Sequence, residues 1–188
     1  MPIDSLRKFI EQYVSLNQGD WQTVSSHFKL TLYPKGSTIL ESGKICDHLA
    51  FLEKGLLRFF IWKEGVDSTK FFTVAPYLFT SQRSFNTRRP ATETIEALED
   101  CHIWQIHFDD HKRLLKLPVY NELAQKITQE VQFFTENILF ELQNQTAEQR
   151  YNNLLSNRPE LLQRVQLKHL ASYLGVTQQS LSRIRKNI

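Results

Sequence analysis

The sequence predicts an α+β protein in three parts: an N-terminal jelly roll (a double-stranded β-helix), one long helix, and a small all-α domain at the C-terminus. Three observations predict this order. Short β-rich runs punctuated by glycine fill the front half, an uninterrupted helical period follows Pro118, and two short amphipathic helices joined at a glycine come last. We place the three parts at residues 1–117, 118–144 and 145–188.

The front half begins with an expected helix at residues 3–17, whose apolar side chains recur at helical spacing. From about Phe28 the pattern changes to short runs, several of which alternate apolar and polar residues as half-buried strands do. These runs are residues 27–33, 49–52, 56–62, 68–74, 92–98 and 102–107. The glycines at the corners between them are Gly36, Gly43, Gly55 and Gly65. Many short strands with such turns indicate a sandwich or jelly roll.

The long helix predicted after Pro118 carries two apolar stripes. The first advances in steps of three and four residues, the a/d seam of a helix that packs on another helix. Its members are Ala124, Ile127, Val131, Phe134 and Ile138. The second stripe runs along a different side through Leu123, Phe133 and Phe140. One stripe suffices to pack a helix on its own domain, so we expect the first to form a homodimer interface. A wholly intramolecular core helix is the alternative.

Two further helix starts are expected beyond this helix. Thr146 and Gln149 have the spacing of a capping box, so a new helix should begin there. Pro159 suits the first turn of the next helix. The polar residues 143–145 are the expected hinge between the long helix and these shorter ones.

Residues 164–188 predict a helix-turn-helix. The first helix presents one apolar face, formed by Leu167, Leu170, Ala171 and Leu174. Gly175 follows, and glycine most readily adopts the left-handed conformation that ends a helix. Val176 fills the corner, and Thr177 is the expected N-cap of the second helix. That second helix should bury Leu181, Ile184 and Ile188.

The opposite face of the second helix is polar, with Gln179, Arg183 and Lys186 at i, i+4 and i+7. Positive charge gathers in the same part of the chain. Residues 158–188 hold six Lys or Arg and one Glu, a net charge of +5, whereas the whole chain is +3, so residues 1–157 are −2. A helix-turn-helix with this charge suits the major groove and the phosphate backbone of double-stranded DNA. A helical hairpin with a solvated polar face is the other interpretation.

Composition excludes several classes of protein. No apolar run among the 188 residues approaches the roughly 20 residues of a membrane span. The N-terminus lacks the apolar core of a signal peptide, so a cytoplasmic protein is expected. Cys46 and Cys101 have no metal-ligand spacing and should be reduced, buried thiols. His107 and His111 lack a third ligand, and we predict no metal, cofactor or catalytic group.

The order of these features resembles the Crp/Fnr family of bacterial transcription regulators. The likeness covers nearly the whole chain and rests on residues 35–43 (KGSTILESG), 51–58 (FLEKGLLR), 93–100 (ETIEALED) and 170–185 (LASYLGVTQQSLSRIR). The resemblance implies an N-terminal sensor roll related to cyclic-nucleotide-binding domains, a dimerisation helix and a C-terminal DNA reader. It further implies a near-palindromic operator, and RNA polymerase as a partner.

The sensor departs from the family pattern. Relatives that bind cyclic AMP hold its phosphate with a Gly-Glu pair at a helix N-terminus and with an Arg just before the strand that matches residues 95–98. Here residues 78–85 (LFTSQRSF) lack that pair, and Ala91 stands at the Arg position. We therefore expect that cyclic AMP is not the effector, whose identity the sequence leaves open. The residues we expect to line a ligand pocket are Phe59, Phe72, Tyr77, Arg83 and Arg89.

In the reader, we expect Gln179 and Arg183 to contact base edges, with Gln178 and Ser180 beside them. The residues expected to hold phosphates or to position the helix are Lys168, Thr177, Arg185 and Lys186. The base-reading Arg and Glu of the family's activator are replaced here by Gln178 and Gln179. The chain also stops at Ile188, without the strands that form a wing in relatives.

Two other functions stay open at the level of sequence. One is an interaction or ligand-sensing module whose helix-turn-helix no longer binds DNA. The other is a metalloenzyme of the cupin type, because related rolls hold a catalytic metal through a His-x-His pair with a nearby Glu and a further His. The histidines of the front half never form that pair; they are His27, His48, His102 and His107.

Overall fold

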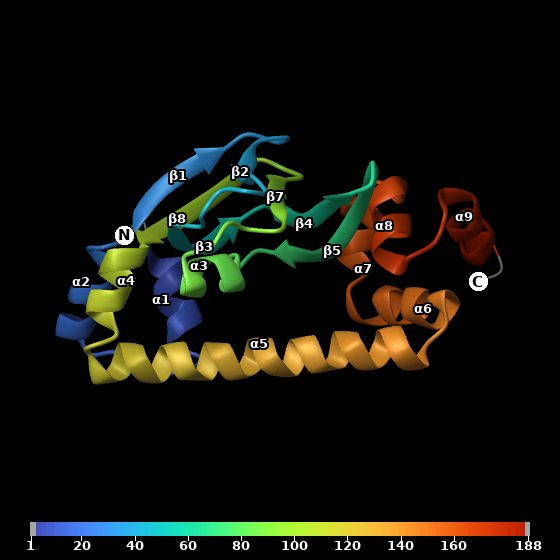
Figure 1. The fold of residues 1–188 in the computed structure, drawn as a ribbon. Coiled ribbons are helices and arrows are strands. Elements are labelled where there is room, and N and C mark those ends of the chain that lie inside the picture. The colour runs from blue at the N-terminus through green and yellow to red at the C-terminus, as the bar shows by residue number, and fades with distance from the viewer. Residues whose placement is uncertain (1–2, 187–188) are drawn as a thin grey trace. The chain divides into compact units, whose positions relative to one another are not determined.

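The computed structural model of the chain describes residues 3–186 (Figure 1). These residues form two compact units. One comprises the described residues up to Phe59 together with residues 72–130, and the other comprises residues 60–71 together with the described residues from Val131 onward. Strands β4 (Leu56–Lys63) and β5 (Val66–Val74) and helix α5 (Pro118–Asn144) therefore contribute residues to both units.

The strands form two four-stranded sheets, which confirms the predicted α+β class and β-sandwich. The first sheet contains, in spatial order, β1 (Lys29–Tyr33), β8 (Cys101–His107), β3 (His48–Lys54) and β6 (Tyr77–Phe79). The second contains β2 (Thr38–Leu40), β7 (Thr94–Ala97), β4 and β5. Strands distant in sequence pair directly: β3 and β8 are antiparallel, with Phe51 opposite Trp104. This register places Phe51 and Trp104 on one face of the sheet, toward the helical layer.

The main core of the first unit lies between that sheet and its helices. Helices α1 (Asp4–Ile10), α2 (Gln18–Ser25) and α4 (Phe108–Leu114) meet the sheet together with the start of α5. Its buried members include Leu6, Phe9, Trp21, Phe51, Trp104, Ile106, Tyr120 and Leu123. Helix α3 (Gln82–Thr87) lies between β6 and β7 in the chain. Burial of this apolar surface, at roughly 25 cal/mol per Å², is the main stabilising contribution to the unit.

The predicted opening helix over residues 3–17 is wrong in length. Helix α1 ends at Ile10, and a second helix, which the apolar spacing did not reveal, begins at Gln18. The side chain of Asn17 accepts a hydrogen bond from the Asp20 amide at 2.8 Å, which caps the new helix. Tyr13 and Val14 lie in the connecting turn but still pack against the core. Their apolar side chains therefore continue the helical spacing beyond the end of α1, and the sequence pattern did not show where the helix stops.

The second unit is mostly helical. Helices α6 (Ala147–Asn157), α7 (Pro159–Arg164), α8 (Leu167–Leu174) and α9 (Gln178–Lys186) follow α5. The capping box is confirmed, since the Gln149 amide donates to Thr146 Oγ1 at 3.2 Å and the Thr146 amide donates to Gln149 Oε1 at 2.8 Å. Pro159 opens α7 as predicted. Among the helices of residues 3–186, none combines the length and apolar character of a membrane span.

Candidate nucleic-acid interface and ligand pocket

Helices α8 and α9 are joined at Gly175. Helix α8 buries His169, Leu170, Ala171 and Leu174, and it ends where Gly175 adopts a φ of +70°. The amides of Gly175 and Val176 then donate to the carbonyl oxygens of Ser172 and Ala171, at 3.1 and 3.0 Å. These bonds satisfy carbonyl groups that the helix end leaves without a partner. The predicted glycine turn is therefore present.

Helix α9 is anchored by one buried side chain and displays its polar residues. The Ser180 amide donates to Thr177 Oγ1 at 3.1 Å, as expected of the predicted N-cap. Leu181 is fully buried and Ile184 is half-buried, whereas Ile188 lies outside the described residues. The exposed residues of this segment are Thr177, Gln178, Gln179, Arg183, Arg185 and Lys186. The apolar anchor thus fixes which face of α9 is presented to solvent.

A shallow surface hollow brings together part of the predicted DNA-binding set. It is lined by Leu167, Thr177, Gln178, Gln179, Ser182 and Arg183. Lys168, Arg185 and Lys186 are exposed but do not line it, and Ser180 is half-buried with its hydroxyl bonded to that of Thr177. The structure therefore groups Gln178, Gln179 and Arg183 on one surface, whereas the three predicted phosphate cations are exposed outside its lining.

Ser172, which the sequence did not single out, ties α8 to the β4–β5 hairpin. Its hydroxyl accepts a hydrogen bond from the Thr69 amide at 2.8 Å and donates to the Asp67 carbonyl oxygen at 3.0 Å. Thr69 is buried, so its amide needs such a partner. Phe71 of the same hairpin packs edge-on against Phe134 of α5, with ring centroids 6.3 Å apart. No local sequence signal marks a serine on a helix surface for a contact so distant in the chain.

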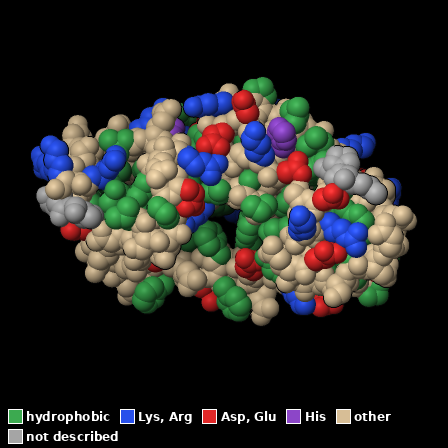
Figure 2. Space-filling model, turned by 180° about the vertical axis from the view of Figure 1, so that it is seen from behind, with side chains coloured by type: hydrophobic (Ala, Val, Ile, Leu, Met, Phe, Trp, Pro, Cys, Tyr) green, Lys and Arg blue, Asp and Glu red, His purple; other side chains and the backbone are tan. Residues whose placement is uncertain are grey.

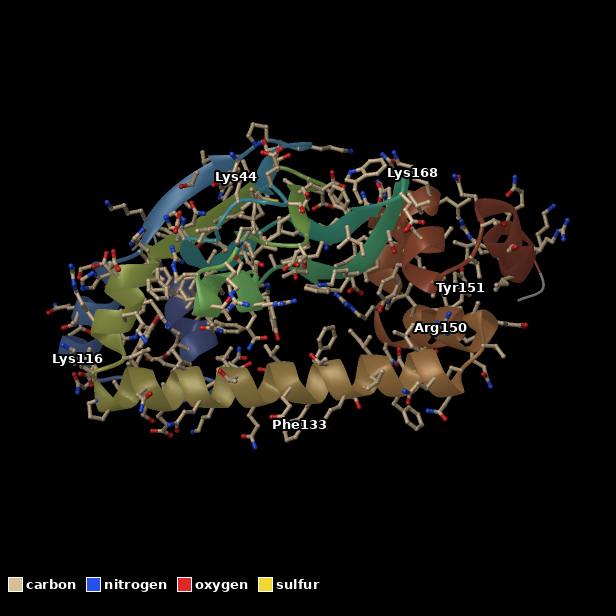
Figure 3. The ribbon with its side chains drawn as sticks, in the orientation of Figure 1. Lys44, Lys116, Phe133, Arg150, Tyr151 and Lys168 are labelled. Carbon is tan, nitrogen blue, oxygen red and sulfur yellow. The ribbon has the colours of Figure 1, made fainter. Side chains whose placement is uncertain are left out.

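The outer side of α5 exposes large apolar side chains. Phe133 and Phe140, one heptad apart, are 54% and 60% exposed. Figure 3 shows Phe133 projecting away from the hairpin, and hydrophobic side chains protrude along the lower edge of Figure 2, where α5 lies. The predicted dimer seam is only partly covered by the chain. Ile127 packs against the core of the first unit, and Phe134 contacts Phe71 but is still 39% exposed. The remaining seam residues are half-buried; they are Ala124, Val131 and Ile138.

The first unit contains a cavity of about 250 Å³ between the two sheets. Its apolar walls are formed by Ile39, Leu40, Ile45, Ala50, Phe79 and Ile95, and its polar groups by Glu41, Lys44, Cys46, Asp47, His48, Thr80 and Gln105. Burial, together with the neighbouring His107, lowers the pKa of His48, so this ring is a neutral donor and acceptor near pH 7. The cavity can hold a small, partly apolar molecule.

None of the five predicted ligand residues lines this cavity. Phe59 and Phe72 are buried, and Tyr77 packs against Phe9 with ring centroids 6.0 Å apart. Arg83 and Arg89 are exposed. The sequence-predicted ligand residues therefore do not coincide with the lining of this cavity.

A buried carboxylate lies beside the segment that corresponds to the phosphate site of relatives. Glu93, which is buried, accepts hydrogen bonds from Ser81 Oγ at 2.6 Å and from Thr92 Oγ1 at 2.9 Å. On neighbouring strands, the buried Arg58 donates from Nη1 to Glu96 Oε1 at 2.8 Å. The Ser81 and Thr92 hydroxyls therefore already donate their hydrogen bonds to Glu93 of the same chain.

Cys46 and Cys101 are free and buried, as predicted. Within residues 3–186, no group of three or more His, Cys, Asp or Glu side chains is placed to hold a metal ion.

Residues 30–117 match the cyclic nucleotide-binding domain family. Among solved structures, the catabolite activator protein of Thermus thermophilus is 20% identical, covers 92% of this chain and 84% of its own, and has a TM-score of 0.58. The c-di-GMP-responsive global regulator CLP of Xanthomonas campestris is 14% identical, covers 91% of each chain, and has a TM-score of 0.69. A Crp/Fnr-family regulator from Eubacterium rectale is 20% identical, covers 92% and 83%, and has a TM-score of 0.67.

At these identities the likeness establishes the fold: a β-sandwich of the cyclic-nucleotide-binding type, a long helix and further helices, arranged as in Crp/Fnr regulators. The structural neighbours are transcription regulators and cyclic-nucleotide-binding proteins. No curated protein sequence matches the chain significantly.

Proposed function

We propose that this chain is a homodimeric, DNA-binding transcription regulator of the Crp/Fnr type. The exposed polar residues of α9 carry the proposal, because Gln178, Gln179 and Arg183 line one surface hollow while the buried Leu181 anchors the helix. Amide side chains pair with adenine, and a guanidinium pairs with guanine, on their major-groove edges. Helices α8 and α9 with the Gly175 turn are the proposed helix-turn-helix, and α9 is its recognition helix.

The charges around α9 support binding to the DNA backbone. Lys168, Arg185 and Lys186 are exposed, and residues 158–188 carry a net charge of +5. Cations at these positions neutralise phosphates in any sequence, so they supply affinity and register, and Thr177 positions the helix. The proposed protein acts in the cytoplasm. Its proposed DNA partner is a near-palindromic operator, and its proposed protein partner is RNA polymerase.

We assign dimerisation to the exposed side of α5. Two aromatic side chains one heptad apart, Phe133 and Phe140, are open to solvent, whereas Ile127 and Phe134 of the sequence-predicted seam have packing partners within the chain. A second copy of α5 is the partner that would cover both phenylalanines through one continuous helix face. Residues 118–144 thus form the dimerisation part, between a sensor (residues 1–117) and a reader (residues 145–188).

Selection from random DNA duplexes tests the proposal. We expect enrichment of a near-palindrome whose half-sites lie about 34 Å apart or a multiple of that distance, because a dimer presents two recognition helices. Arg183→Ala should relax base preference at one position in each half-site and cost about 1–3 kcal/mol of specific binding. Lys186→Ala should weaken binding to all sequences alike and flatten its salt dependence.

Arg113→Ala is the matched control, because Arg113 is an exposed arginine of α4 that plays no part in the proposed interface. It should leave both the selected sequence and the affinity unchanged. Selection that enriches no sequence would contradict DNA reading and favour a protein-interaction module with a degenerate helix-turn-helix.

Cyclic AMP and cyclic GMP should bind only weakly. The expected arginine position holds Ala91, and the Ser81 and Thr92 hydroxyls already donate to the Glu93 carboxylate. Loss of two charge-assisted bonds, at about 1.5–3 kcal/mol each, weakens binding by about 10²–10⁴-fold and moves a micromolar dissociation constant to about 0.1–10 mM. Calorimetry measures this directly. A dissociation constant below about 10 μM, abolished by Arg83→Ala or Arg89→Ala, would show instead that the sensor binds the cyclic phosphate through a rebuilt anion site.

A further inference from the structure

Arg150 occupies a position that is unfavourable for its own helix. It is the fourth residue of α6, at the end of the first turn, where the helix keeps part of its N-terminal positive charge and a cation gains nothing from it. Neither the apolar spacing of α6 nor its capping pattern requires an arginine at this position. A helix N-terminus favours acidic side chains, so a cation there is expected to gain compensating contacts elsewhere in the fold.

The compensating contacts of Arg150, which Figure 3 labels, lie at the ends of two other helices. Arg150 Nη1 donates to the Gln145 carbonyl oxygen at 2.8 Å, directly after α5, and Nη2 donates to the Leu174 carbonyl oxygen at 2.7 Å, at the end of α8. Helix C-termini carry partial negative charge, so one guanidinium complements both. A second tie joins α6 to the same hinge, since Asn153 Nδ2 donates to Gln145 Oε1 at 3.0 Å.

The guanidinium lies beside the turn that leads into α9. Leu174 immediately precedes Gly175, and a Cβ built at Gly175 would lie 3.9 Å from Arg150 Nη2. The Nε atom of Arg150 is buried, so the group faces the protein interior on that side. These contacts connect the end of α5, the start of α6 and the α8–α9 turn through one planar group.

We propose that Arg150 is a positioning residue of the reader, which fixes the α8–α9 turn against the end of α5 without touching DNA. This inference rests on the proposed function, because it concerns the direction in which α9 meets the major groove. The guanidinium is a rigid fork whose two nitrogens hold both carbonyl groups at once. A lysine keeps the charge, but it places a single ammonium on a flexible stem and cannot hold the two carbonyls in the same fixed geometry.

The test compares Arg150→Met, Arg150→Lys and the surface control Arg113→Ala with the parent chain. Each is titrated with the selected operator and with an unrelated duplex at several salt concentrations. For Arg150→Met we expect the ratio of specific to non-specific affinity to fall by about tenfold, equivalent to 1.4 kcal/mol. The affinity for the unrelated duplex and its salt slope should stay unchanged. Arg150→Lys should lie between Arg150→Met and the parent, and Arg113→Ala should match the parent.

A second readout does not depend on DNA. The chain has six glycines, so the amide resonance of Gly175 can be followed in a nitrogen–proton spectrum. It should shift in both Arg150 variants and not in Arg113→Ala. Equal weakening on both duplexes with a reduced salt slope would show that Arg150 contacts phosphate. An unchanged affinity ratio with an unchanged Gly175 resonance would overturn the positioning role. A parent chain that selects no DNA would refute the proposed function. In that case a shift of the Gly175 amide resonance in the Arg150 variants would still show whether Arg150 holds the α8–α9 turn.

Discussion

The double variant Phe133→Glu with Phe140→Glu should be a monomer, whereas the parent chain should be a dimer. Phe133 and Phe140 are 54% and 60% exposed, so covering each one newly buries only about half of the roughly 150–250 Å² that a fully buried aromatic side chain removes from water. At roughly 25 cal/mol per Å² this is a substantial part of the association free energy, and two unpaired carboxylates in the interface would add a desolvation penalty. Light scattering gives the mass directly. Affinity for a two-fold operator should fall by about 10²–10⁴, because the second half-site is no longer bound by a linked subunit.

The control for this experiment adds the same charge on another side of α5. Thr128 and Thr135 are exposed and lie one heptad apart, as the two phenylalanines do. Thr128→Glu with Thr135→Glu should leave the dimer intact. If this control dissociates the dimer and the phenylalanine variant does not, the interface lies on another face of α5, where Leu139 and Leu142 are also exposed. Identical masses for all chains would show that α5 does not mediate dimerisation.

Local features of the C-terminal helices could be predicted from sequence because a few neighbouring residues determine them. The Gly175 turn, the Thr177 cap and the capping box of Thr146 and Gln149 each depend on one backbone conformation or one short hydrogen bond. The buried position of Leu181 follows from helical periodicity in the same way. Strands β2 and β6 were missed, since each is three residues long and too short to show alternation.

The candidate sites were harder to predict because they depend on contacts between distant parts of the chain. The cavity combines residues from β2, β3, β6, β7 and β8, and only the sheet order brings these strands together. The predicted ligand set was instead chosen around neighbouring segments, and none of its residues lines the cavity. Ser172 bonds to the backbone amide of Thr69, and Arg150 bonds to the backbone carbonyl of Leu174. Every residue type has these backbone groups, so the sequence cannot indicate which of them a side chain will contact. The two stripes on α5 were visible, but the sequence did not show that the chain covers Leu123 of one and Ile127 of the other, and leaves Phe133, Phe134 and Phe140 exposed.

The other large effect should come from Arg58, whose side chain is 1% exposed in the β-sandwich. Its Nη1 atom donates to Glu96 Oε1 at 2.8 Å, between the neighbouring strands β4 and β7. Burial lowers the pKa of the guanidinium, while the hydrogen bond and charge of Glu96 raise it, so Glu96 offsets part of the cost of burying this cation. Removing one partner of such a pair leaves a charge that neither water nor another cation fully compensates.

Arg58→Ala should therefore lower the free energy of unfolding by about 3–5 kcal/mol, a large fraction of the 5–15 kcal/mol typical of a domain. Urea denaturation measures the loss. The double variant Arg58→Met with Glu96→Leu should recover most of it, because a well-packed apolar pair of similar volume has no unpaired charge to bury. Arg113→Ala removes an arginine that is 71% exposed, and it should change stability by no more than about 0.5 kcal/mol. If Arg58→Ala loses no more than that control, or if the double variant is less stable than Arg58→Ala alone, the ion pair is not what Arg58 contributes to the sandwich.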